Sequence, residues 1–241
     1  MNEFDDICPY DDGEVPSVIA RLIADTEFID LLLSRRVPLL AKVCPWLARP
    51  FVRQSLRRLT KNMLTVADIQ AQMTLALKKL LDTTTDGYSF SGLDKLDSSK
   101  AYLFMSNHRD ISLDPALVCL GLVMAEHQTA RLAIGDNLLS KPFASDLMRV
   151  NRSFIVKRSA SSRREKLEAL KVLSRYIRYS INTERVSVWI AQAEGRAKDG
   201  WDRTETALLK MLSLSKGERQ DFAAATGELN LIPVSISYEY D

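Results

Sequence analysis

A histidine with two nearby aspartates is the group in this sequence best suited to chemistry. In residues 106–115, His108 is followed by Asp110 and then by Asp114, which precedes Pro115. A histidine beside a carboxylate fits a general base that the acid holds in one tautomer. A lone histidine is more often structural, and Asp114-Pro115 also has the pattern of a helix N-cap followed by proline. Residue types alone leave both interpretations open.

The same segment imitates the catalytic loop of protein kinases. His108-Arg109-Asp110 matches the kinase triplet, but a kinase needs an asparagine seven residues after the histidine, where this chain has Pro115. The glycine-rich loop and the Asp-Phe-Gly motif of kinases are also missing. Neither Gly-x-Ser-x-Gly nor a P-loop occurs, so serine hydrolases and P-loop nucleotidases lose their main support.

Short strands that alternate with helices must position this segment. From about residue 88 we expect strands at 102–105, 130–134, 153–156, 186–190 and 229–237, and helices from 115, near 144–149, over 162–181 and near 205–214. Such alternation predicts an α/β fold with a mostly parallel central sheet covered by helices. His108 then follows a strand's carboxyl end, where ligands bind in open α/β sheets. The last strand resembles a buried one, which leaves open whether the protein continues past Asp241.

The first third of the chain has a helical pattern. Apolar residues recur at helical spacing over 15–83, with breaks expected at Pro45 and Pro50 and a helix expected over 66–81. We therefore predict a helical N-terminal layer over residues 1–85 and an α/β domain over 86–241.

Charge is distributed unevenly, although the formal net charge is only +2. Residues 1–14 contain six acids and no base, which predicts a mobile, solvated tail. Residues 35–67 contain eight bases and no acid. This basic block could meet anionic lipid or nucleic acid, but it has only Trp46 and Phe51 as aromatics and no nucleic-acid-binding motif. We expect no nucleic-acid partner.

Several features favour a cytoplasmic location. Cys8, Cys44 and Cys119 are widely spaced and odd in number, so we expect reduced thiols. The acidic N-terminus predicts no signal peptide. Even residues 37–52 are interrupted by charges, so we expect no membrane span.

Basic residues also follow two other predicted strands. Lys157 and Arg158 come directly after the strand expected at 153–156, and Glu194-Gly195-Arg196 forms a turn after the strand expected at 186–190. Each cation alone fits a solvated surface charge. Together they should lie along one edge of the sheet, where they could bind a phosphate.

These segments together resemble the glycerolipid acyltransferases, the lysophosphatidic acid and glycerol-3-phosphate acyltransferases. Four blocks occur in the family's order over about 102–236: Asn107-His108 with Asp114, Phe154-Ile155-Val156-Lys157-Arg158, Glu194-Gly195-Arg196, and Ile232-Pro233-Val234. The family's helical N-terminal element is similar to residues 15–83.

The sequence also departs from the family pattern. Five residues instead of four separate His108 from Asp114, so Asp110 stays a candidate partner. Asn151 replaces a family glycine, and Arg196 stands one place early. The family's second-block arginine could correspond to Lys157 or to Arg158.

The resemblance implies transfer of a fatty acyl group from an acyl-CoA or acyl-carrier-protein thioester to a hydroxyl of glycerol phosphate or a lysophospholipid. His108 would be the general base with Asp114 as its acid, and no metal or prosthetic group would be needed. The implied substrate-binding residues are Lys157, Arg158, Glu194, Gly195 and Arg196. The enzyme would lie peripherally on the cytoplasmic face of an anionic membrane. The alternatives are another lyso-lipid acceptor or a non-catalytic anionic-lipid-binding protein.

Overall fold

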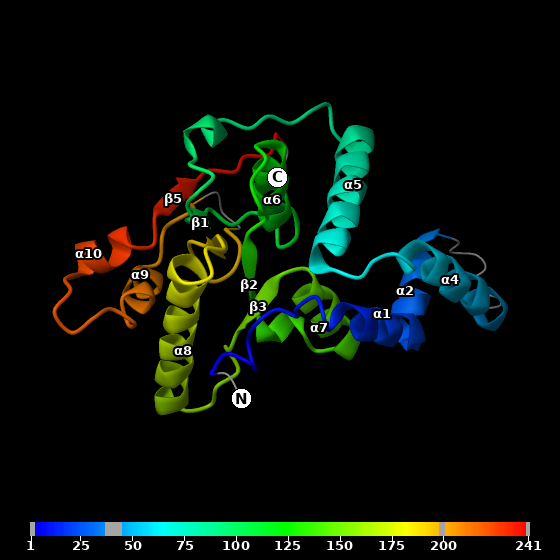
Figure 1. Ribbon diagram of the computed structural model, residues 1–241, viewed down its shortest axis with the longest axis horizontal. Coiled ribbons are helices and arrows are strands. Elements are labelled where there is room, and N and C mark those ends of the chain that lie inside the picture. The colour runs from blue at the N-terminus through cyan, green and yellow to red at the C-terminus, as the bar shows by residue number, and fades with distance from the viewer. Residues whose placement is uncertain (1–2, 37–44, 198–200, 240–241) are drawn as a thin grey trace. The chain divides into compact units, whose positions relative to one another are not determined.

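The computed structural model describes residues 3–36, 45–197 and 201–239 (Figure 1). The chain falls into two compact units. Unit 1 comprises Met1–Cys8, Thr74–Asn137 and Ser153–Asp241, and unit 2 comprises Pro9–Met73 and Leu138–Arg152. This grouping reflects contacts and not independent folding, so the domain boundary near residue 85 stays a prediction.

Unit 2 is helical. It contains α1 (Val15–Ala24), α2 (Thr26–Arg36), α4 (Pro45–Thr60), the start of α5 (Val66–Thr84) and α7 (Pro142–Val150). Its core comes from α1, α5, α7 and Met63, through Val15, Val18, Leu22, Met63, Val66, Ile69 and Val150. Beside this core, Asp146 of α7 accepts hydrogen bonds from Tyr10 at 2.7 Å and from Arg21 at 2.8 Å. These bonds tie α7 to the N-terminal helices despite its distance in sequence.

The expected break at Pro50 is wrong, because α4 runs through it. Proline's fixed φ of about −65° is itself helical. The cost at this position is the lost hydrogen bond to the Trp46 carbonyl and the crowding of that carbonyl by the ring. Pro45 begins the helix, where a missing N–H is tolerated. Earlier in the chain, Asp25 separates α1 from α2, and its carboxylate accepts a hydrogen bond from the Phe28 amide at 2.8 Å.

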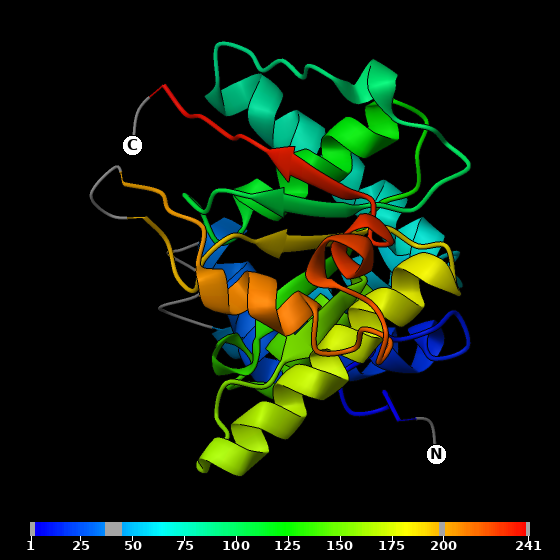
Figure 2. The same cartoon turned by 90° about the vertical axis from the view of Figure 1, so that its left-hand side faces the viewer.

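Unit 1 is built on a five-stranded sheet in the order β3-β2-β4-β1-β5. The strands are β1 (Leu103–Ser106), β2 (Arg131–Gly135), β3 (Ser153–Val156), β4 (Val188–Ala191) and β5 (Leu231–Val234). All neighbouring pairs are parallel, and Figure 2 shows β5, β1 and β4 side by side with their arrowheads at the same end. The predicted α/β fold with a parallel sheet is confirmed, and the carboxyl ends of its strands share one edge.

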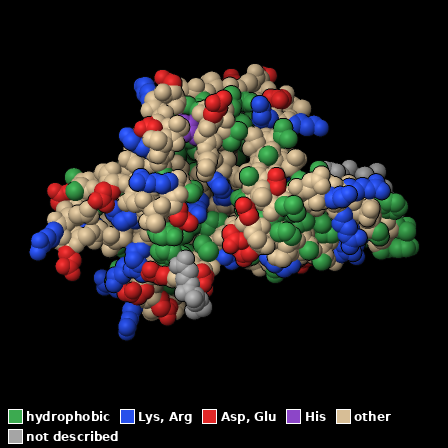
Figure 3. All heavy atoms as spheres, in the orientation of Figure 1, with side chains coloured by type: hydrophobic (Ala, Val, Ile, Leu, Met, Phe, Trp, Pro, Cys, Tyr) green, Lys and Arg blue, Asp and Glu red, His purple; other side chains and the backbone are tan. Residues whose placement is uncertain are grey.

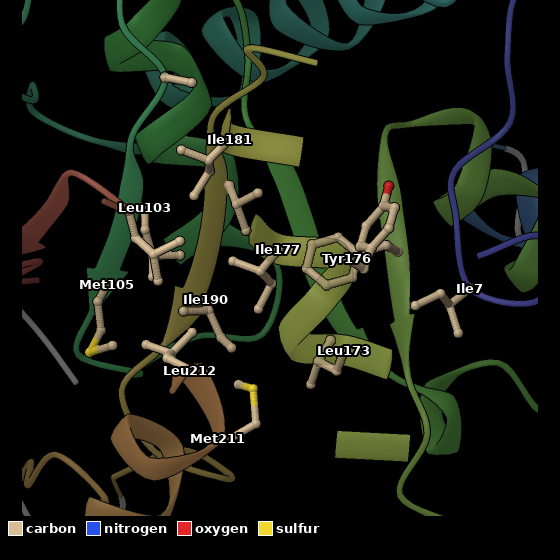
Figure 4. Close-up of a cluster of buried hydrophobic side chains, with 14 of the residues drawn as sticks. Ile7, Leu103, Met105, Leu173, Tyr176, Ile177, Ile181, Ile190, Met211 and Leu212 are labelled. Atoms are coloured by element: carbon tan, nitrogen blue, oxygen red, sulfur yellow. The ribbon is translucent and has the colours of Figure 1, made fainter. Parts of the chain in front are cut away.

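Helices cover both faces of this sheet. Alternate strand residues point to opposite faces, so Leu103 and Met105 join one cluster and Phe104 the other. The first face packs on α8 (Arg163–Asn182) and α9 (Thr206–Leu212), as the close-up of Leu173, Tyr176, Ile177, Ile181, Met211 and Leu212 shows (Figure 4). The second face packs on α6 (Leu113–Met124). The sheet is therefore buried on both sides, as a parallel sheet requires.

The last strand is not the buried one that its sequence suggested. β5 is an edge strand, and none of its residues is fully buried. An edge position also explains Pro233, which cannot donate a ladder hydrogen bond. The short helix α10 (Phe222–Gly227), which precedes β5, was not predicted.

The acidic N-terminal segment is not the solvated tail that its charges suggested. Phe4 and Ile7 are buried in the core of unit 1, and the Ile7 carbonyl accepts from the Ile155 amide of β3 at 2.9 Å. Asp6 pairs with Lys157 at 3.0 Å. The buried side chains of Phe4 and Ile7, which lie among the acidic residues, hold this segment beside β3.

The longest of the described helices are α8 with 20 residues and α5 with 19. None of the described helices has both the length and the apolar character needed to cross a bilayer. Two short 3₁₀ turns, Leu93–Lys95 and Asp136–Leu138, complete the described elements.

Candidate active site

The site begins at the carboxyl end of β1, a fully buried strand paired with β4 and β5. His108 lies two residues beyond it. The His108 amide donates to Asp202 at 3.2 Å, and the His108 carbonyl accepts from the Ala197 amide at 2.9 Å. The segment after β4 thus holds the backbone of His108 on both sides.

His108 and Asp114 form a hydrogen-bonded pair. His108 Nδ1 lies 2.9 Å from Asp114 Oδ2, and Asp114 is fully buried while 13% of the His108 side chain is exposed. An ionised carboxylate can only accept, so the hydrogen belongs on Nδ1 and the lone pair on Nε2. The Trp189 ring of β4 meets the imidazole edge-on, with centroids 6.3 Å apart. This geometry gives His108 the tautomer that a general base needs.

Four hydrogen bonds stabilise the Asp114 carboxylate. Besides His108, Oδ2 accepts from the amides of Arg109 at 2.7 Å and Asp110 at 3.0 Å, and Oδ1 accepts from the Tyr238 hydroxyl at 2.7 Å. Burial alone would raise the pKa of Asp114, but the hydrogen bonds from His108, Tyr238 and the two amides outweigh it and lower the pKa below its usual value. Asp114 therefore stays ionised beside His108.

The second candidate acid, Asp110, has a different position. Its Oδ1 accepts from the amides of Ser112 and Leu113, both at 2.7 Å, so it caps the start of α6. The expectation that Asp114 is the N-cap and Pro115 the first helical residue is wrong, because α6 begins at Leu113. Asp110 satisfies the first amides of the helix, which leaves Asp114 to bind His108.

Two neighbours of the pair were not among the predicted site residues: Asn107, although it belongs to the first family block, and Tyr238. Asn107 donates to the Ile236 carbonyl and accepts from the Ile236 amide, both at 2.7 Å. This places Tyr238 against Asp114, and burial and its bond to Asp114 raise the pKa of the Tyr238 hydroxyl. For Tyr238 the only indication in the sequence was its position shortly after the last strand, which is a weak signal.

The predicted cations differ in their surroundings. Lys157 pairs with Asp6 at 3.0 Å. Arg158 lies across the end of β2, where a Cβ on Gly135 would come within 3.1 Å of its Nε, and pairs with Glu194 at 3.3 Å. Arg196 is exposed, and no ion pair of it is found in the described part of the chain. Of the three cations, Arg196 is the one best able to meet an anion.

The turn after β4 requires its glycine. Gly195 has a φ of +87°, and no atom lies within 4 Å of the point where a Cβ would stand, so the backbone conformation and not lack of space selects glycine. The preceding Glu194 amide donates to Glu205 at 3.1 Å. Glu194 itself faces Arg158 across the edge of the sheet. The second and third sequence blocks therefore meet at one place.

A parallel α/β sheet that carries, at its carboxyl edge, a histidine bonded to a buried aspartate and several basic side chains has the elements expected of an acyl-transfer enzyme. A family model described as Acyltransferase matches residues 88–237. The chain therefore belongs to this family, the glycerolipid acyltransferases, which act with an acyl donor and a lipid acceptor. No curated protein matches the chain.

Proposed function

We propose that this acyltransferase transfers a fatty acyl group from an acyl-CoA or acyl-carrier-protein thioester to a hydroxyl of glycerol phosphate or a lysophospholipid. The observation that carries the proposal is the 2.9 Å bond between His108 and a fully buried Asp114. The enzyme would work in phospholipid biosynthesis, peripherally on the cytoplasmic face of a membrane.

The proposed reaction needs a single base. As the acceptor oxygen attacks the thioester carbonyl, its proton passes to Nε2 of His108, and Asp114 stabilises the imidazolium. The carbon–sulfur bond then breaks, and the thiolate takes the proton back from His108. The thioester already carries an activated acyl group, so no metal or prosthetic group enters the proposal.

The test is transfer of labelled acyl groups by the purified protein. We expect product with acyl-CoA or acyl-carrier protein as donor and with glycerol 3-phosphate or lysophosphatidic acid as acceptor. A lyso-aminolipid and a hydroxyacyl lipid serve as alternative acceptors. Transfer only to these would change the acceptor assignment. If the folded protein transferred to none of the acceptors with either donor, the enzymatic proposal would fail in favour of lipid binding alone.

Arg196→Ala is expected to raise the acceptor KM by roughly 10- to 100-fold and to leave the donor KM nearly unchanged. A charge-assisted hydrogen bond to phosphate contributes about 1.5–3 kcal/mol, and each 1.4 kcal/mol is about a factor of ten in affinity. Steady-state kinetics with each substrate varied in turn measures both constants.

Lys157→Ala is the matched control for Arg196→Ala. Lys157 already pairs with Asp6, so its loss should lower thermal stability slightly and leave both KM values alone. An acceptor KM that rose for Lys157→Ala but not for Arg196→Ala would reverse the assignment of these two cations.

A further inference from the structure

The Asp114 carboxylate has different partners on its two oxygens. Oδ2 takes the bonds from His108 and from the amides of Arg109 and Asp110. Oδ1 takes the 2.7 Å bond from Tyr238, a residue 124 positions away. The Tyr238 hydroxyl thus fixes Oδ1, while the other three bonds fix Oδ2. With both oxygens held, the plane of the carboxylate is fixed. The plane of the carboxylate in turn sets the direction in which His108 points.

Tyr238 reaches Asp114 because the chain after β5 is fastened to the chain after β1. Ser106 and Val234 are paired in register at the carboxyl ends of these two strands. One residue past Ser106, the Asn107 side chain both donates to and accepts from the backbone of Ile236 at 2.7 Å. Because the Asn107 side chain bonds both the C=O and the N–H of Ile236, it extends the hydrogen bonding between β1 and β5 beyond the ends of these strands. Asn107 therefore sets the position of Tyr238 two residues further on.

We infer that Tyr238 is a positioning residue for the His108–Asp114 pair, and that Asn107 acts with it by anchoring the segment that carries the hydroxyl. This inference rests on the proposed function, since it assumes that His108 is the general base. Tyr238 acts through Asp114 and not on the substrate. Its bond holds the carboxylate in the orientation that keeps hydrogen on Nδ1 and the lone pair on Nε2.

The hydroxyl also sets the basicity of the pair. Arg109 and Asp110, in the loop after β1, donate their backbone amides to Asp114, and Asp202, after β4, accepts from the His108 amide. The Asp110 carboxylate also acts electrostatically on the Tyr238 hydroxyl. The Tyr238 hydroxyl donates a hydrogen bond to Asp114, which disperses the charge of the carboxylate. Without that bond, Asp114 becomes more basic and stabilises the imidazolium form of His108 more strongly. The acid limb of activity therefore moves to higher pH.

Tyr238→Phe tests this directly. We expect kcat to fall roughly tenfold with the acceptor KM little changed, because one charge-assisted hydrogen bond is lost while the substrate contacts remain. The acid limb of the kcat/KM profile should move up by roughly half a unit to one unit. Asn107→Ala should move the limb in the same direction, because it releases the same hydroxyl from Asp114.

The matched control is Tyr10→Phe. Tyr10 donates to Asp146 over the same 2.7 Å, and Asp146 is also buried. Both phenylalanine variants should lose similar thermal stability, but only Tyr238→Phe should move the pH profile. If the profile of Tyr238→Phe coincided with that of Tyr10→Phe, Tyr238 would be merely structural and the inference would be overturned.

A second measurement separates this inference from the proposed function. NMR of the His108 ring nitrogens, assigned with His127→Gln, needs no turnover and reports which nitrogen carries the hydrogen. We expect hydrogen on Nδ1 in the wild type, where Nδ1 bonds Asp114 at 2.9 Å, and a weaker preference for Nδ1 in Tyr238→Phe. A wild type that transfers no acyl group would overturn the proposed function, whereas an unchanged His108 tautomer in the variant would overturn the role of Tyr238.

Discussion

We expect His108→Ala to lower the rate of acyl transfer by roughly 10²–10⁴-fold and to leave the protein folded, because a general base contributes about that much. The His108 side chain lies at the edge of the sheet and is partly exposed, so its removal leaves no large internal cavity. Asp114→Asn should lose a comparable factor, since the amide can donate to Nδ1 and then favours the tautomer with hydrogen on Nε2. Turnover and thermal unfolding are measured on the same preparations.

Two controls belong with these variants. His127→Ala removes the other histidine, and Asp110→Asn changes the carboxylate that caps α6. Asparagine caps helices about as well as aspartate, and His127 makes none of the bonds found at the His108–Asp114 pair. Both controls should therefore keep most of the activity. Near-normal turnover of a folded His108→Ala protein would contradict the mechanism. A larger loss for Asp110→Asn than for Asp114→Asn would reassign the partner of the base.

Local patterns predicted most of the α/β unit. The bounds of β3 match the expected strand at residues 153–156, and β1, β2 and β4 lie within one or two residues of theirs. Strands predicted from short apolar runs, with helices between them, leave few alternatives to a parallel sheet. Its shared carboxyl edge then brings the block of His108 near the block of Glu194. The family resemblance favoured Asp114 as the partner of His108, with Asp110 as the alternative, and the structure has the 2.9 Å bond to Asp114. The catalytic roles of both residues stay predictions.

What could not be predicted depends on contacts between distant residues. Tyr238 reaches Asp114 only because β5 pairs with β1 in one register, and no local pattern specifies that choice. Lys157 has an acid as its partner because Phe4 and Ile7 bury the N-terminal segment beside β3. The start of α6 was also predicted wrongly from local pattern. Asp114-Pro115 matched a helix N-cap followed by proline, but the Asp110 carboxylate bonds the Leu113 amide, and the helix begins at Leu113.

From its basic and apolar residues, we expect the segment at residues 35–64 to dock on anionic membranes, and the structure describes part of this segment. Residues 37–44, which include Val37, Leu39, Leu40 and Lys42, lie outside the described residues. In α4, Trp46 is 66% exposed and Phe51 77%, and the helix has no fully buried residue. Figure 3 shows hydrophobic and basic side chains gathered over α2 and α4.

The basic residues of this segment whose side chains are described divide into two groups. Arg49 pairs with Asp30 at 2.8 Å, and Arg53 donates to the carbonyls at the end of α1 at 3.2 Å. These two are structural. Four others are exposed and make no ion pair within the described ranges of the chain: Arg35, Arg57, Arg58 and Lys61.

One face of α4 combines apolar and basic side chains. Phe51 follows Leu47 by four residues, and Arg58 follows Phe51 by seven, so all three lie on the same side of the helix. Leu47, Phe51 and Arg58 are each exposed. This face therefore offers both apolar contact and positive charge to an anionic surface.

We expect this surface to bind anionic vesicles and to release them at high salt. A basic residue near anionic lipid contributes about 1 kcal/mol, so four contribute about 4 kcal/mol, roughly a thousandfold in partitioning. Insertion of Trp46 and Phe51 would add to this. Arg58→Gln should weaken binding about fivefold. Arg49→Gln is its control, because it removes the same charge from a residue already paired with Asp30 and should cost stability more than binding.

Co-sedimentation with vesicles, with and without phosphatidylglycerol and at low and high salt, measures this partitioning. Charge-driven binding requires that phosphatidylglycerol raise the bound fraction and that salt lower it, since ions screen exposed charges beyond about 10 Å at 0.1 M. Phe51→Ser should lower binding at both salt concentrations, because it removes apolar contact and not charge. Binding that did not depend on lipid charge or salt, or no binding at all, would leave the exposed face of α4 without this role.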